Sequence, residues 1–265
     1  MKVRLTRGSW FTFSVIATLI AVLALAGDAW AAAKRAPTTQ PAGVTTKVAS
    51  STTQPSPKSG GWMTKHEKYL ARAKEGNIDL LFLGDSITEG WGNNEVWKKY
   101  YGELKAANFG ISGDQTQNVL WRLLNGEIDG ISPKAAVVMI GTNNSGGSTA
   151  EQVADGVTAI VKTLREKLPN TKVLLLAIFP RGEKPNPQRE KIQKANETIA
   201  KLDDGKMVRY LDIGPKFVDK DGVISKEVMP DFLHLSKKGY EIWAESMQPL
   251  LAELMELKKE PPKGK

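Results

Sequence analysis

Four short polar blocks of the sequence carry the side chains that ester hydrolysis by a serine nucleophile requires. In chain order these are Gly84-Asp85-Ser86, Ser112-Gly113-Asp114, Gly141-Thr142-Asn143 and Asp231-Phe232-Leu233-His234. A serine esterase needs a hydroxyl on a tight turn, hydrogen-bond donors for the oxyanion, and an imidazole oriented by a carboxylate. Each block alone fits an ordinary turn or helix cap, but the four together and in this order favour catalysis.

The counts of histidine and cysteine narrow the chemistry. The chain has two histidines, His66 and His234, and no cysteine. No disulfide, thiolate metal site or cysteine nucleophile can therefore form, and a histidine-rich zinc enzyme is not expected. His66 lies in the charged stretch 65–68, which predicts a solvated surface residue. His234 follows Asp231 by three residues, a spacing at which a carboxylate and an imidazole can meet through one short turn.

The elements that must position these blocks alternate between strand-like and helix-like patterns. Apolar runs typical of strands buried on both faces occupy residues 78–83, 106–109, 135–140, 173–179 and 207–211. Helical patterns occupy 117–124, 149–168, 188–202 and 240–254, where Pro249 should cause a kink. This alternation predicts an α/β fold: a three-layer α/β/α sandwich with a five-stranded parallel sheet. The site is then expected at the carboxyl ends of the strands, which the first three polar blocks follow, while the fourth block precedes the last helical pattern.

The two ends of the chain indicate export rather than nucleic-acid binding. Residues 1–31 combine a basic start, an apolar run at 10–26 and Ala29-Trp30-Ala31, which predicts a signal peptide cut after Ala31. An uncleaved membrane anchor is the alternative. Residues 32–60, rich in Thr, Ser and Pro, predict a disordered linker, followed by a domain at 61–257 and a basic tail at 258–265. The net charge of +8 divides into +6 for residues 1–60, +3 for the tail and −1 for the domain, so no nucleic-acid partner is expected.

The polar blocks resemble the motifs of the SGNH hydrolases, a branch of the GDSL esterase and lipase family. Four longer stretches are similar to the catalytic subunits of intracellular platelet-activating-factor acetylhydrolase: residues 108–114, 119–123, 180–187 and 231–235. The likeness covers about residues 75–255 and implies the flavodoxin-like fold of that family. Two features depart from it: Ile87 stands where the family name expects leucine, and the cytosolic subunits lack a signal peptide and linker.

This resemblance implies a role for each matched residue. Ser86 would attack the ester carbonyl, His234 would take its proton, and Asp231 would orient the imidazole. The backbone N–H groups of Ser86 and Gly113, with the side-chain amide of Asn143, would form the oxyanion hole. No metal or organic cofactor is implied.

The same resemblance gives expectations about substrate and assembly. Three residues, Ile87, Thr142 and Leu233, would border the acyl pocket and limit it to short chains. The related subunits dimerise, which raises a homodimer as an expectation for this chain.

The resulting hypothesis is an exported serine esterase that removes short acyl groups, above all acetyl, in the periplasm, cell envelope or medium. Its substrate would be an acetylated polysaccharide or a phospholipid, with no stable membrane span after signal cleavage. Two alternatives stay open: a non-catalytic envelope binding module that retains the fold, and a longer-chain lipase or lysophospholipase.

Overall fold

The computed structural model describes residues 50–92 and 94–257. The expected signal peptide, the first part of the expected linker and the basic tail lie outside these ranges. Within them, none of the helices is both long enough and apolar enough to cross a lipid bilayer.

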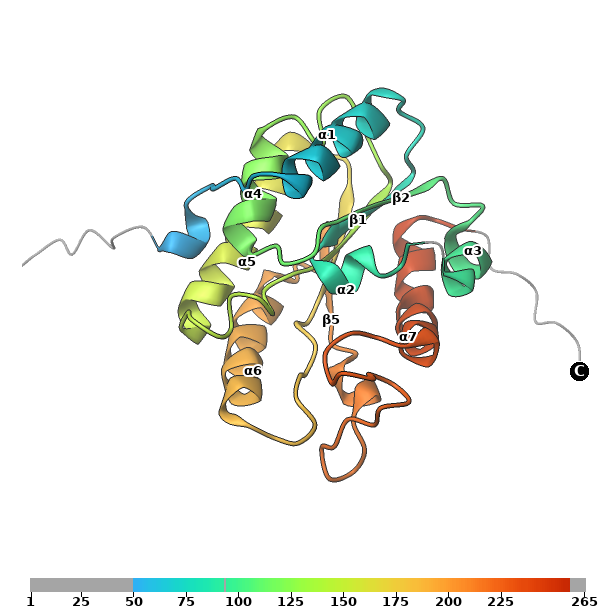
Figure 1. The fold of residues 1–265 in the computed structure, drawn as a ribbon. Helices are drawn as coiled ribbons and strands as arrows, with labels where there is room; N and C mark the ends of the chain where they lie inside the picture. Colours follow the sequence, from blue (N-terminus) through green and yellow to red (C-terminus); the bar gives the residue numbers. More distant parts are fainter. Residues whose placement is uncertain (1–49, 93, 258–265) are drawn as a thin grey trace, which may run out of the picture. The chain divides into compact units, whose positions relative to one another are not determined.

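The core of the fold is a five-stranded parallel sheet in the order β2-β1-β3-β4-β5 (Figure 1). The strands are β1 (Leu80–Gly84), β2 (Ala106–Gly110), β3 (Ala135–Met139), β4 (Lys172–Leu176) and β5 (Val208–Leu211), each paired in parallel with its neighbours. The chain passes from β1 to β2 on one side and then returns to β3 on the other side of β1. The order therefore reverses at β1, where a site is expected beyond the carboxyl ends of the strands.

Helices cover both faces of this sheet. On one face lie α1 (Gly61–Lys74), α4 (Thr116–Leu124), α5 (Ala150–Lys167) and α6 (Pro187–Ile199); on the other lie α3 (Glu95–Tyr101) and α7 (Lys237–Leu254). Strand β1 shows why both faces must be covered, because its side chains alternate between them. Leu81 and Leu83 pack into the apolar cluster under α4, α5 and α6, whereas Leu80 and Phe82 pack into the cluster under α3 and α7. The short elements are η1 (Ser51–Thr53), α2 (Ser86–Glu89), η2 (Ala200–Leu202) and η3 (Gly214–Phe217). This architecture confirms the predicted three-layer α/β/α sandwich.

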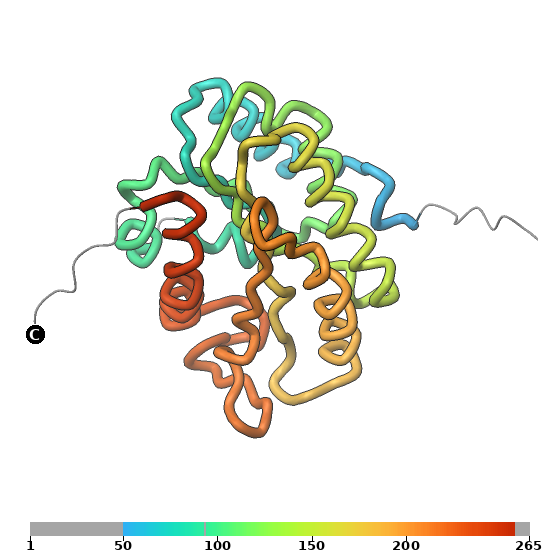
Figure 2. The backbone as a smooth tube through the Cα atoms, turned by 180° about the vertical axis from the view of Figure 1, so that it is seen from behind, coloured from blue at the N-terminus to red at the C-terminus, as the bar shows by residue number. Residues whose placement is uncertain are grey.

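The start of the described chain differs from the linker predicted for residues 32–60. The segment 50–60 lies beside α4 and α5 in both views of the molecule, where it is drawn in blue (Figures 1 and 2). The side chain of Thr52 is buried and donates a hydrogen bond to the carbonyl of Gln152 at 2.6 Å. Hydrogen bonds of polar groups, rather than apolar packing, attach this segment to the domain. The prediction of disorder rested on the lack of apolar residues, so it missed this attachment.

Candidate active site

The expected nucleophile lies on a tight turn between the central strand and a short helix. Strand β1 ends at Gly84 and α2 begins at Ser86, with Asp85 as its N-cap. One carboxylate oxygen of Asp85 accepts the backbone N–H of Ile87 at 3.0 Å. The turn places Ser86 beyond the carboxyl end of β1, and its own N–H is among the first donors of a helix, which have no acceptor within the helix.

The structure brings Ser86, His234 and Asp231 together in one hydrogen-bonded chain. Ser86 Oγ lies 2.9 Å from His234 Nε2, and His234 Nδ1 lies 2.6 Å from Asp231 Oδ2. The side chains of His234 and Asp231 are 45% and 56% exposed, so the imidazole faces solvent. A hydroxyl, an imidazole and a carboxylate in this order can transfer a proton from oxygen to Nε2 while Nδ1 stays oriented.

The loop that carries this histidine and carboxylate is shaped by local hydrogen bonds. Asp231 Oδ1 accepts the backbone N–H of Leu233 at 3.1 Å and of His234 at 2.7 Å. Burial opposes the ionisation of Asp231, but these bonds and the His234 ring outweigh it and lower the pKa of the carboxyl. Phe232, which follows Asp231, has a φ of 59°, a left-handed conformation that costs about 1–2 kcal/mol in a residue with a side chain. The carboxylate is thus held in its charged form against the imidazole.

The expected oxyanion donors lie in the loops that follow β2 and β3. Gly113 is in the loop 111–115, and its φ of 75° is a conformation that glycine adopts without strain. Asn143 Nδ2 donates to the carbonyl of Asp114 at 2.8 Å, which ties the two loops together. An amide nitrogen carries two hydrogens, so this bond leaves a second one for a ligand.

The three residues expected to border the acyl pocket are buried to different degrees. Residues Ile87 and Thr142 are each 1% exposed, and Leu233 is partly buried. The Thr142 hydroxyl accepts a hydrogen bond from Arg181 Nη1 at 3.1 Å, which joins the loop after β3 to the loop after β4. Ile87 packs among the core residues below α2 and offers little surface to a ligand. Their role in limiting acyl length stays a prediction.

A second carboxyl group lies directly beside Ser86. Asp85 is fully buried, and its Oδ2 has no hydrogen-bond partner among the described residues. Burial raises the pKa of Asp85 to about 7, the Ile87 N–H opposes the shift, and the nearby Asp114 adds to it. This group therefore changes its charge near neutral pH, next to the candidate nucleophile.

Replacing Asp85 with asparagine is expected to remove a pH-dependent loss of stability. The unfolded chain releases this proton near pH 3.8 and the folded protein near pH 7. Because the folded state binds the proton more tightly, the free energy of unfolding falls as pH rises through this window, by up to about 4 kcal/mol. Asparagine keeps an acceptor for Ile87 and has no charge to desolvate. Denaturant unfolding should show Asp85→Asn gaining stability over wild type from about pH 4 to 7; a constant difference would contradict this.

The structure corrects the prediction that His66 is a solvated surface residue. It is 3% exposed, and Nδ1 lies 3.2 Å from Oε1 of the buried Glu127. Glu127 pairs with Arg122, whose guanidinium also binds Asp114 at 3.0 Å. The prediction was wrong because it rested on the charged neighbours of His66 in sequence. On α1, Trp62 and His66 are four residues apart and share one buried face, whereas the charged neighbours lie on other faces of the helix.

This buried cluster lies directly behind the candidate oxyanion loop. Asp114, one of the two acids of the cluster, follows Gly113 in the chain and accepts a hydrogen bond from Trp62 Nε1 at 2.6 Å. Burial raises the pKa of Asp114, while Arg122 and Trp62 oppose that rise. Sequence reasoning missed the cluster, although the spacing of Trp62 and His66 was a helical signal for a shared buried face.

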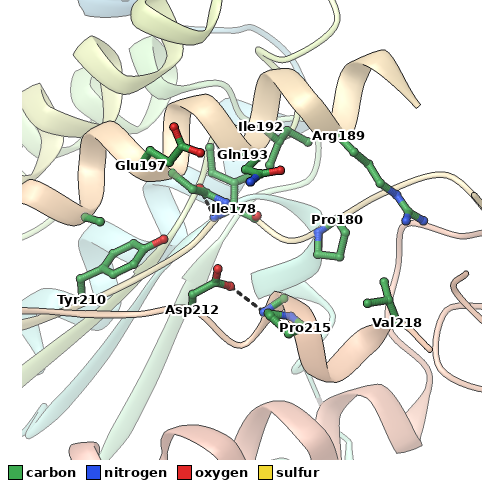
Figure 3. Close-up of a pocket in the computed structure, with 13 residues that line it drawn as sticks. Ile178, Pro180, Arg189, Ile192, Gln193, Glu197, Tyr210, Asp212, Pro215 and Val218 are labelled. Atoms are coloured by element: carbon green, nitrogen blue, oxygen red, sulfur yellow. Dashed lines mark hydrogen bonds between the residues drawn. The ribbon is translucent and has the colours of Figure 1, made fainter. Parts of the chain in front are cut away.

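A cavity of about 550 Å³ lies elsewhere, between α6 and the end of β5 (Figure 3). Tyr210 and Asp212 line it from the β5 side, and Ile192 and Glu197 line it from α6. No residue of the Ser86 site lines this cavity. Within residues 50–92 and 94–257, no three His, Asp or Glu side chains come together as a metal would need.

Comparison with known proteins identifies a family to which this chain is similar. The model of the GDSL-like lipase/acylhydrolase family matches residues 82–242, more than half of the chain and all four polar blocks. The chain belongs to this family. Membership makes it a hydrolase of carboxylic esters, the reaction that lipases and acylhydrolases share.

Individual relatives point in the same direction. The alpha1 subunit of platelet-activating factor acetylhydrolase IB from Homo sapiens is 44% identical over 197 residues, 74% of this chain and 85% of the relative. A solved structure from Streptococcus pneumonia, described as a platelet activating factor, has a TM-score of 0.60 at 26% identity, covering 71% and 94% of the two chains. A mutant acetyl-xylooligosaccharide esterase from Geobacillus Stearmophilus shares the fold, with a TM-score of 0.54 at 17% identity and coverages of 69% and 96%. The GDSL resemblance of the sequence motifs is thereby confirmed.

Proposed function

We propose that this GDSL-family protein is an exported serine esterase that removes acetyl groups through an acyl-enzyme on Ser86. The observation that carries the proposal is the hydrogen-bonded chain from Ser86 Oγ through His234 to Asp231, at 2.9 and 2.6 Å. Such a chain activates a hydroxyl that is otherwise a weak nucleophile at neutral pH.

In the first half of the reaction, His234 Nε2 takes the proton of Ser86 as Oγ attacks the carbonyl carbon. The carbonyl oxygen becomes an oxyanion, which the backbone N–H groups of Ser86 and Gly113 and the Asn143 amide would hold. His234 then gives its proton to the leaving alcohol oxygen as the ester bond breaks. Ser86 is left acylated and the imidazole neutral.

In the second half, water takes the place of the alcohol. His234 Nε2 takes a proton from this water, whose oxygen attacks the acyl carbon. The same donors hold the second oxyanion, and the proton returns to Ser86 Oγ as the carboxylic acid leaves. Asp231 stays ionised throughout because its hydrogen bonds lower its pKa, and it stabilises the charged imidazole that forms twice in the cycle.

The natural substrate is the finer part of the proposal. The relatives named as acetylhydrolases support the removal of an acetyl group, and the export pattern of residues 1–31 supports a target in the periplasm, envelope or medium. An acetylated polysaccharide and an acetylated phospholipid both meet these conditions. Acetate release from a panel of both classes, compared between wild type and Ser86→Ala, distinguishes them.

Replacing Asn143 with alanine is expected to lower kcat with little change in KM. Its amide would bind charge that exists only in the transition state, so its loss should not weaken substrate binding. Removing one side-chain oxyanion donor costs roughly 10²–10³ in rate, about 2.7–4 kcal/mol. Steady-state kinetics with p-nitrophenyl acetate measure both constants.

Asn144 is the matched control for this variant. It is buried, accepts the N–H of Thr116 at 2.9 Å and donates to Gln117 at 3.1 Å, so its work is to join the β3 loop to α4. Asn144→Ala should therefore lower Tm more than kcat. If Asn143→Ala retains full kcat, or Asn144→Ala has the lower kcat of the two, the oxyanion assignment is wrong.

The rate is expected to fall as the acyl chain grows. The residues expected to border the pocket, Ile87, Thr142 and Leu233, would leave room for two or three carbons. One methylene changes discrimination by about 1–3 kcal/mol, roughly 10- to 200-fold, so butyrate, which is two methylenes longer than acetate, should react more slowly by at least that factor. Hydrolysis of p-nitrophenyl esters of increasing length tests this. Equal kcat/KM for acetyl and octanoyl esters would overturn the acetyl preference and favour a lipase.

A further inference from the structure

The segment 50–60 is fastened to the two helices that follow the oxyanion loops. Thr52 donates to the Gln152 carbonyl in α5, and its own carbonyl accepts Thr116 Oγ1 of α4 at 2.9 Å. Gly156 shows how closely these parts approach. A Cβ there would lie 2.3 Å from Thr116 Oγ1 and 2.9 Å from the Thr52 carbonyl oxygen. The glycine in the middle of α5 therefore makes room for the segment.

A second pair of bonds joins the segment to the first turn of α4. The N–H of Ser56 donates to the Gln117 carbonyl at 3.1 Å, and the Ser56 carbonyl accepts Asn118 Nδ2 at 2.9 Å. Asn118 also accepts the N–H of Gln115, the last residue of the loop 111–115. The segment and the oxyanion loop thus share a binding partner.

Lys58 then contacts the loop itself. Its Nζ donates to the carbonyl of Gly113 at 2.5 Å and lies 4.0 Å from Asp114 Oδ1. On the other side of Gly113, the N–H of Ser112 donates to Glu89 at 2.7 Å. Gly113 has no side chain to restrict its rotation, so the direction of its N–H depends on how the backbone on either side is held. Glu89 holds Ser112 on one side, and Lys58 holds the peptide between Gly113 and Asp114 on the other.

We propose that Lys58 is a positioning residue for ester hydrolysis, which holds the Gly113 carbonyl and so fixes the Gly113 N–H toward the oxyanion. This inference rests on the proposed function of the Ser86 site. The ammonium group also adds positive charge beside a loop where negative charge develops in the transition state. The segment 50–60 would then be a working part of the catalytic domain rather than a spacer in front of it.

Replacing Lys58 in the full-length protein tests the proposal. Lys58→Met removes the charge and keeps the length of the side chain, whereas Lys58→Arg keeps a cationic donor. With the neutral ester p-nitrophenyl acetate, we expect Lys58→Met to lower kcat about tenfold at unchanged KM, the lower end of what a hydrogen bond to a charged group contributes. Lys58→Arg should recover most of this loss. Lys58 is 36% exposed, so Tm should change little.

Lys68→Met is the matched control, because Lys68 is an exposed lysine on α1. It should have the kcat of wild type. Wild-type kcat in Lys58→Met, an equal loss in Lys68→Met, or a lower Tm without a lower kcat would each overturn the proposal. A change confined to KM for anionic esters would also overturn it, because Lys58 would then bind substrate. Ser86→Ala in the same assay tests the proposed function separately: hydrolysis that does not depend on Ser86 refutes that function.

Discussion

Ser86→Ala is expected to abolish ester hydrolysis while the protein stays folded. The variant removes only the hydroxyl oxygen that lies 2.9 Å from His234 Nε2. Alanine is at least as good a helix former as serine, and the cap of α2 comes from Asp85 rather than from Ser86. In a comparable hydrolase, removal of the nucleophile costs roughly 10⁶ in kcat.

Two measurements together check this expectation. Hydrolysis of p-nitrophenyl acetate should fall to the background rate, and a fluorophosphonate probe should label wild type once and the variant not at all. Ser148→Ala, in the loop between β3 and α5, is the matched control and should react and label like wild type. Undiminished labelling of Ser86→Ala would show that the nucleophile is another residue.

The second large effect is expected from His234→Ala. Its imidazole is the only base that contacts Ser86 Oγ among the described hydrogen bonds, and it takes part in both halves of the reaction. Loss of the histidine alone should cost about as much as loss of the whole triad, roughly 10⁶ in kcat. A double variant, Ser86→Ala with His234→Ala, should therefore be little worse than either single one, and steady-state kinetics of all three measure this.

His66 provides the comparison between the two histidines of the chain. Because its ring contacts buried Glu127 rather than Ser86, His66→Gln should lower Tm, while kcat of the folded fraction changes far less than in His234→Ala. A greater loss of kcat in His66→Gln than in His234→Ala would mean that the general base has been misassigned.

The sheet and its site edge could be predicted because their signals are local in sequence. All five residues of β1 are buried, and an apolar run of that length ending in glycine indicates such a strand directly. The pair Asp231 and His234 is also local, since three residues separate the two side chains. The contact between Ser86 and His234 spans 148 residues, and no local pattern indicates it. It was expected from the set of residue types that a serine esterase needs and from the resemblance to a known family.

The features that the sequence did not predict depend on polar partners far along the chain. The buried His66 ring has its polar partner in Glu127, which lies 61 residues further along the chain. The buried Thr52 hydroxyl has its partner in the Gln152 carbonyl, 100 residues further along. Their neighbours in sequence are charged or polar, which is typical of solvated helices and linkers. Only the folded structure brings these hydrogen-bond partners together. Local composition therefore predicted an exposed His66 and a disordered segment around Thr52, whereas both residues are buried.

The central claim is that hydrolysis passes through an acyl-enzyme on Ser86. The most direct test mixes wild-type protein with p-nitrophenyl acetate, stops the reaction with acid before steady state, and locates the added mass by peptide mass spectrometry. The account predicts one acetyl group, on the peptide that contains Ser86, and none in Ser86→Ala. Acetate release with no acetylated peptide, or with the acetyl group on another residue, would contradict it.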